Sequence, residues 1–122
     1  NNGIILLNKS QSVQRQRFTV MHELGHYLLG HVGSDPRYRD SSRTAEEQEA
    51  DRFAVGCLMP ACVLWALHAT TAEEIAVICN VSMQAAEIRS RRMQILLARN
   101  KFLTHPLERQ VFEQFKHFIN SK

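Results

Sequence analysis

Apolar residues recur along most of the chain at three- and four-residue spacings, which is typical of amphipathic helices. From about Val13 to His31 they predict a long helix whose buried stripe consists of Phe18, Met21, Leu24, Gly25, Leu28 and Leu29. A second helix is predicted around Glu47, with an apolar face of Ala50, Phe53, Ala54, Cys57 and Leu58. The run from Gly3 to Leu7 is short, continuous and apolar, and it predicts a strand.

The second half of the chain predicts further helices. Ala61 to His68 is a short apolar segment, and Thr71 with Glu74 three residues later has the form of a capping box. Ser82 is placed to cap a longer helix that runs through Leu97, and Pro106 begins a last amphipathic one. The predicted fold class is therefore mainly α, and α+β only through the N-terminal strand.

Length and composition bound the architecture. A chain of 122 residues with 44% hydrophobic content predicts one globular domain, which buries about two thirds of its unfolded surface. We expect this single domain over residues 1–122, with the strand and the first helices in 1–68 and a helical part in 69–122.

The charge and the cysteines exclude several classes of protein. A net charge of +3 is a weaker basic surplus than nucleic-acid binding requires, so a nucleic-acid partner is not expected. Three cysteines without a C-x-x-C pair argue against a disulfide framework, and Cys57 and Cys62 are predicted to be buried thiols. No apolar run approaches about 18 residues and the given sequence shows no charged-then-apolar leader, so we expect a cytoplasmic protein without a membrane partner.

The most informative segment is His22-Glu23-Leu24-Gly25-His26 inside the first predicted helix. Four residues advance a helix by about 400°, so both histidines lie on one face and can reach one ion. This is the zinc-site spacing of metalloproteases, in which the glutamate is the general base. The same five-residue pattern also arises by chance on surface helices, but here a buried stripe beside it would hold the two histidines in place.

A third ligand must come from elsewhere. His31 would lie on the opposite helical face, about 900° from His22, and is expected to face water. Glu47 and Asp51 share a face of the second helix, so Glu47 could bind the metal while Asp51 accepts the free N–H of a liganding histidine. Glu49, Glu46 or no acid at all remain alternatives, because an acidic first turn is also typical of an ordinary solvated helix.

Three ordered blocks resemble the ImmA/IrrE-type metallopeptidases. They are Arg17-Phe18-Thr19 before His22-Glu23-Leu24-Gly25-His26, then Glu47 to Ala54, then Leu58-Met59-Pro60. The resemblance implies a zincin-like helical core and a gluzincin-like site, with His22, His26 and Glu47 as ligands and Glu23 as catalytic base. It also implies a role in mobile elements or stress responses, where members of this family cleave helix-turn-helix repressors. The family has further residues before its strand, whereas this chain opens at Asn1, so an N-terminal piece is expected to be missing.

The expected cofactor is Zn²⁺, with Mn²⁺ or another divalent ion as alternatives, because two histidines and a carboxylate suit several of them. The expected partner is a protein substrate, a transcriptional repressor. A strand near Ile4 to Leu6 could align that substrate by edge pairing. Tyr27, Tyr38 and His105 are candidate donors to the carbonyl oxygen of the substrate, although no spacing argument selects one. The oligomeric state is left open.

A rival interpretation rests on residues 71–92. They predict two helices with a short break, and Arg89, Arg91 and Arg92 lie on the second helix. That outline resembles a helix-turn-helix, so the chain could be a DNA-binding or partner-docking module with a non-catalytic metal site. The simpler alternative is that both helices pack on the catalytic core and expose their charges to water.

Overall fold

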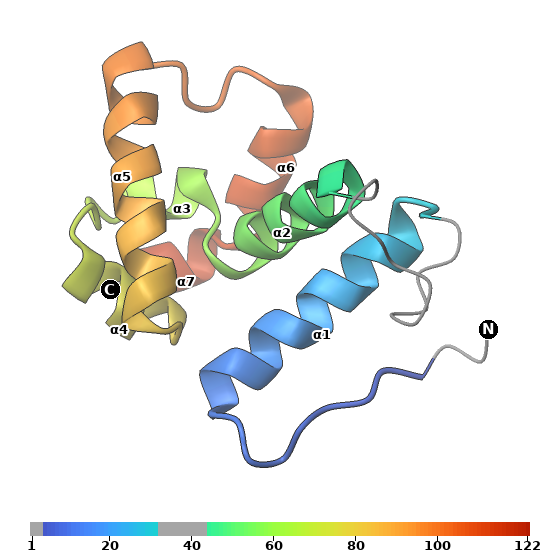
Figure 1. Ribbon diagram of the computed structural model, residues 1–122. Coiled ribbons are helices and arrows are strands. Elements are labelled where there is room, and N and C mark those ends of the chain that lie inside the picture. Colours follow the sequence, from blue (N-terminus) through green and yellow to red (C-terminus); the bar gives the residue numbers. More distant parts are fainter. Residues whose placement is uncertain (1–3, 32–43) are drawn as a thin grey trace. The chain divides into compact units, whose positions relative to one another are not determined.

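The computed structural model describes residues 4–31 and 44–122, and most of these residues are helical (Figure 1). The prediction of a mainly α fold is confirmed. The chain divides into two compact units, Asn1–Leu58 and Met59–Lys122, each of which is described by itself below. The prediction of one domain over residues 1–122 stays a prediction.

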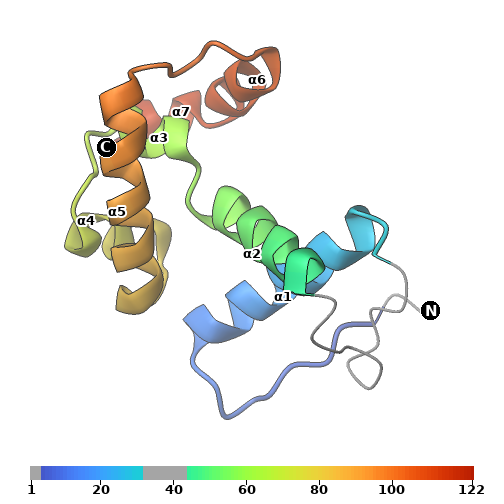
Figure 2. The ribbon, with the colours of Figure 1, turned by 45° about the horizontal axis from the view of Figure 1, so that its top comes forward.

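The first unit is built on two helices. α1 spans Val13–Leu28 and begins where the Ser12 side chain accepts a hydrogen bond from the backbone N–H of Arg15, at 3.1 Å. α2 spans Thr44–Leu58, and the two helices pack side by side (Figures 1 and 2). Contacts from successive turns of α1 fall on progressively earlier turns of α2, so the pair is antiparallel.

Small residues allow these two helices to approach closely. Ala50 and Ala54 of α2 are fully buried. On α1, a Cβ atom added at Gly25 would lie only 3.0 Å from Cδ1 of Phe53. That spacing is tighter than an ordinary van der Waals contact, so a side chain at position 25 would require the Phe53 side chain to shift by a few tenths of an ångström.

The predicted apolar faces of the first unit are only partly buried. Leu28 and Leu29 are exposed, while Gly25 is buried. Cys57 is exposed as well, so the prediction of a buried thiol is wrong there. It holds for Cys62 in the second unit, where burial and the nearby Glu108 carboxylate raise the pKa of the thiol.

The N-terminal strand is not observed. Residues 4–7 form no strand, and the described parts of the chain contain none. A strand requires a partner for its backbone groups, and none of the described segments supplies one. The apolar side chains are exposed instead, with Ile4 at 71% and Leu6 at 86%, so the expected alignment of a substrate along a strand edge loses its basis.

The second unit contains five helices: α3 (Ala61–Ala66), α4 (Ala72–Cys79), α5 (Met83–Arg99), α6 (Pro106–Gln114) and α7 (Lys116–Asn120). The capping box predicted from Thr71 and Glu74 is present at the start of α4. Its hydrogen bonds lower the pKa of the Glu74 carboxyl group, with the bond from the Thr71 side chain as the largest cause. Ser82 caps α5, as predicted. The last amphipathic segment divides at Phe115 into two helices.

The core of the second unit is apolar, and the side chain of Arg89 links α5 to the segment before α3. Its buried side chains are Met59, Cys62, Val63, Leu64, Ala69, Ile75, Val81, Ala86 and Met93. From α5, Nε of Arg89 donates to the backbone carbonyl of Met59, at 3.0 Å. The Trp65 and Phe102 rings stack with their centroids 5.1 Å apart.

Among the described residues, no helix has the length and apolar character needed to span a membrane.

The contact between Gly25 and Phe53 gives a testable prediction. Replacing Gly25 by alanine forces α1 away from the Phe53 ring, and such overpacking should lower the free energy of unfolding by about 1 kcal/mol. Gly56→Ala is the matched control, because nothing lies within 4 Å of a Cβ atom added at Gly56. Since alanine favours a helix over glycine, this control should raise the free energy of unfolding by up to about 1 kcal/mol.

Urea unfolding followed by circular dichroism measures both variants. If Gly25→Ala is as stable as Gly56→Ala, the two helices do not depend on a close approach at position 25.

Candidate metal centre

The two histidines of the H-E-x-x-H segment lie one turn apart on α1, on the side that faces α2. His26 is the most buried polar residue described, with 1% of its surface exposed. The His22 side chain is half-buried, at 16%. Their Nε2 atoms are 3.1 Å apart, so both rings present the same nitrogen to one point. Of the stripe that the sequence predicted beside this pair, Gly25 is buried and Phe18, Met21 and Leu24 are partly buried.

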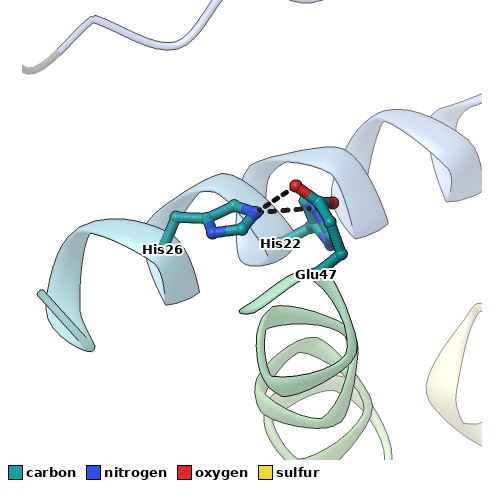
Figure 3. Close-up of side chains that lie close together, drawn as sticks. All are labelled: His22, His26 and Glu47. Atoms are coloured by element: carbon teal, nitrogen blue, oxygen red, sulfur yellow. Dashed lines mark hydrogen bonds and ion pairs between the residues drawn. The ribbon is translucent and has the colours of Figure 1, made fainter. Parts of the chain in front are cut away.

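Glu47 approaches this point from the first turn of α2. One carboxylate oxygen lies 2.9 Å from His22 Nε2 and the other lies 3.1 Å from His26 Nε2. Figure 3 shows the three side chains pointing toward one another from the two helices. One donor atom from each residue lies within 4.8 Å of the other two, which makes the group a candidate site for a metal ion.

Asp51 lies one turn further along α2 and contacts the other side of the His22 ring. Its Oδ1 atom is 2.7 Å from His22 Nδ1. A carboxylate can only accept, so Asp51 favours a proton on Nδ1, while Glu47 lies nearly as close to Nε2, at 2.9 Å. With the proton on Nδ1, the Nε2 atom of His22 has a lone pair directed at Glu47 and His26. Such a contact is the usual way in which a carboxylate orients a metal-binding imidazole, and that role of Asp51 remains a prediction.

The donor set suits a divalent cation. Two imidazole nitrogens and a carboxylate meet at distances at which lone pairs repel each other unless a proton or a cation lies between them. The chemistry of the group matches zinc sites with two histidines and one glutamate, and it also suits several other divalent ions.

The other two glutamates of this turn of α2, Glu46 and Glu49, lie against His31. Oε1 of Glu49 is 3.4 Å from Nε2 of His31, and Oε2 of Glu46 is 3.8 Å from Nδ1 of the same ring. Of the three glutamates that the sequence left open as ligands, the structure brings Glu47 to the two histidines. The binding of a metal by Glu47 remains a prediction.

The expectation that His31 faces water is wrong, because its side chain is only 7% exposed. The helix does not continue to residue 31. Gly30 has a φ of +72°, and the backbone N–H of His31 returns to the carbonyl of His26 at 3.0 Å. This is a helix-ending turn of the Schellman type, and Gly30 directly before His31 was the sequence signal for it.

The sequence also singled out Glu23, Tyr27, Tyr38 and His105 for the reaction. Glu23 follows His22 on α1 and is half-buried. Tyr27 is 63% exposed, and the His105 side chain caps α6 by accepting from the backbone N–H of Leu107. Tyr38 lies outside the described residues.

The helix pair suspected of binding DNA is present as α4 and α5, joined through Asn80 in a left-handed conformation. Arg89, however, is engaged with Met59, and its burial lowers the pKa of its guanidinium group. Arg91 and Arg92 are exposed. Of the three arginines that suggested DNA binding, Arg89 therefore stabilises the unit itself.

Comparison with known proteins is consistent with this geometry. No curated protein and no solved structure gives a significant match to the chain. Residues 1–91 match the model of the family Peptidase_M78, which is described as the IrrE N-terminal-like domain. The matched residues include both helices of the donor group and most of α5. The chain therefore belongs to the IrrE N-terminal-like family of metal-dependent peptidases.

Proposed function

We propose that this chain is a zinc-dependent endopeptidase that cleaves a helix-turn-helix repressor protein. The observation that carries the proposal is the convergence of His22, His26 and Glu47 from two helices, with Asp51 oriented behind one of the histidines. A surface helix that carried these residues by chance would not bury His26 or place a carboxylate against both rings.

In this proposal, His22, His26 and Glu47 hold the ion through two imidazole nitrogens and a carboxylate. A divalent ion in such a site lowers the pKa of a bound water and polarises the carbonyl group of the substrate. Three protein ligands leave room for that water, as in catalytic zinc sites generally. Asp51 keeps His22 in the tautomer that binds, by accepting the proton of Nδ1.

Glu23 is the proposed general base. It is next to His22 on α1, so its carboxylate is carried on the helix that supplies two of the ligands. Glu23 takes a proton from the attacking water as the water oxygen adds to the peptide carbon. It then passes this proton to the departing amine nitrogen, so the peptide bond is hydrolysed with no net change in Glu23.

The repressor substrate and a cytoplasmic location are proposals that rest on the family resemblance and on cysteine usage. The three cysteines are free thiols, which suits a reducing compartment.

Metal content tests the ligand set. The unmodified chain is expected to carry about one zinc ion, as in structural and catalytic zinc sites with a complete ligand set. His22→Ala, His26→Ala and Glu47→Ala should each lose most of it, because two remaining ligands bind weakly. Elemental mass spectrometry of the purified proteins measures the zinc content.

Glu46→Ala is the matched control for Glu47→Ala, because it removes a carboxylate from the same helical turn. It should retain the zinc. An unchanged zinc content in Glu47→Ala would instead indicate that Glu46 or Glu49 is the third ligand. No zinc in the unmodified chain, even when zinc is supplied, would remove the basis of the proposed enzyme.

Glu23→Gln tests the catalytic base and the substrate together. The amide cannot take a proton from water, so cleavage should fall by at least about 100-fold while zinc remains bound. The measurement compares new protein N-termini, by mass spectrometry, in cells that express the unmodified chain and in cells that express Glu23→Gln.

We expect new N-termini within a helix-turn-helix repressor only with the unmodified chain. New N-termini confined to other proteins would refute the repressor substrate and leave the peptidase. Identical N-termini with both chains would refute the peptidase.

A further inference from the structure

His31 is a buried histidine next to the metal centre for which the proposed reaction has no use. The turn at Gly30 brings its ring back against His26, and the two ring centroids are 5.0 Å apart. The rings meet edge-on, at an interplanar angle of 66°, so a nitrogen of one is directed at a nitrogen of the other. The Nδ1 atoms are separated by 2.7 Å.

A nitrogen–nitrogen distance of 2.7 Å is a hydrogen bond, which requires one proton between the two atoms. On the far side of the His31 ring, Nε2 lies 3.4 Å from Oε1 of Glu49. When His26 binds an ion through Nε2, its remaining proton is on Nδ1 and is donated to Nδ1 of His31, so the proton of a neutral His31 ring is on Nε2, where it faces Glu49. The Nδ1 atom of His31 is then the acceptor.

The same hydrogen bond favours one tautomer of His26. With His31 as the acceptor, the proton of His26 is on Nδ1 and its Nε2 keeps a lone pair. That Nε2 atom is the one that lies 3.1 Å from both Glu47 and His22 Nε2. His26 is therefore held in the tautomer that a metal ligand requires, just as Asp51 holds His22.

We propose that His31 is a positioning residue, which works with Glu49 to hold His26 in the orientation and the tautomer that bind the metal. The inference rests on the metal centre of the proposed function. Each histidine ligand then has an acceptor behind it: the Asp51 carboxylate directly for His22, and the Glu49 carboxylate through the His31 ring for His26. Removing such an outer partner typically weakens metal binding by about 10- to 100-fold.

The test is the zinc affinity of His31→Phe, measured by competition with a chromophoric chelator. Phenylalanine fills the space of the imidazole and accepts no hydrogen bond, so zinc binding should weaken by about 10- to 100-fold. His31→Gln should recover part of the loss, because its side-chain oxygen can accept from His26 Nδ1. His117→Phe is the matched control, since His117 is an exposed residue of α7, and its zinc affinity should be unchanged.

A second variant keeps the test decisive if the substitution of the buried His31 prevents folding. Glu49 is exposed, so Glu49→Ala is expected to fold, and it should weaken zinc binding by less than His31→Phe does. Nitrogen-15 NMR of the metal-free proteins reports the tautomer of His26 directly. We expect protonated Nδ1 in the unmodified chain and a shift toward protonated Nε2 in His31→Phe, which a merely structural role for His31 would not produce.

The outcomes separate this inference from the proposed function. If the unmodified chain binds no zinc, the metal centre itself is refuted. If that chain binds zinc, and His31→Phe and Glu49→Ala bind it equally tightly with the same His26 tautomer, the positioning role of His31 is refuted and the metal centre stands.

Discussion

The packing of α1 against α2 is the interaction on which the site depends. The donor atoms come from both helices, and the absence of a side chain at Gly25 lets α1 lie close against Phe53 of α2. Ala50 and Ala54, which are fully buried, have small side chains that likewise project little from the facing side of α2. A shift of a few tenths of an ångström between the two helices is comparable to the positional tolerance of a metal site. The small residues that set the spacing of the helices therefore also set the positions of the ligand atoms.

The antiparallel direction of the two helices divides the acids of α2 between the His22–His26 pair and His31. Asp51 lies against His22, Glu47 lies between the two histidines, and Glu49 lies against His31. The charges at the start of α2 therefore do more than complement the helix dipole. The sequence pattern alone left Glu46, Glu47 and Glu49 as alternative third ligands, because spacing along one helix does not determine where another helix crosses it.

Regular periodicity predicted the helices and the face that carries His22 and His26, because it reflects local geometry. Features set by the end of an element or by a tertiary partner were missed. His31 was misplaced because the helix was extended through Gly30, and the strand at residues 4–7 was predicted from apolar character without a partner for its backbone. The exposure of Cys57 likewise depends on which segments cover the end of α2, which periodicity cannot specify.

X-ray absorption at the zinc edge, on the zinc-loaded unmodified chain, tests the central claim most directly. We predict a first shell of nitrogen and oxygen at about 2.0–2.2 Å, with the scattering signature of two imidazole rings. A sulfur shell at about 2.3 Å would place a cysteine on the ion, and three imidazoles would place a further histidine there. Either result would contradict a centre built from His22, His26 and Glu47.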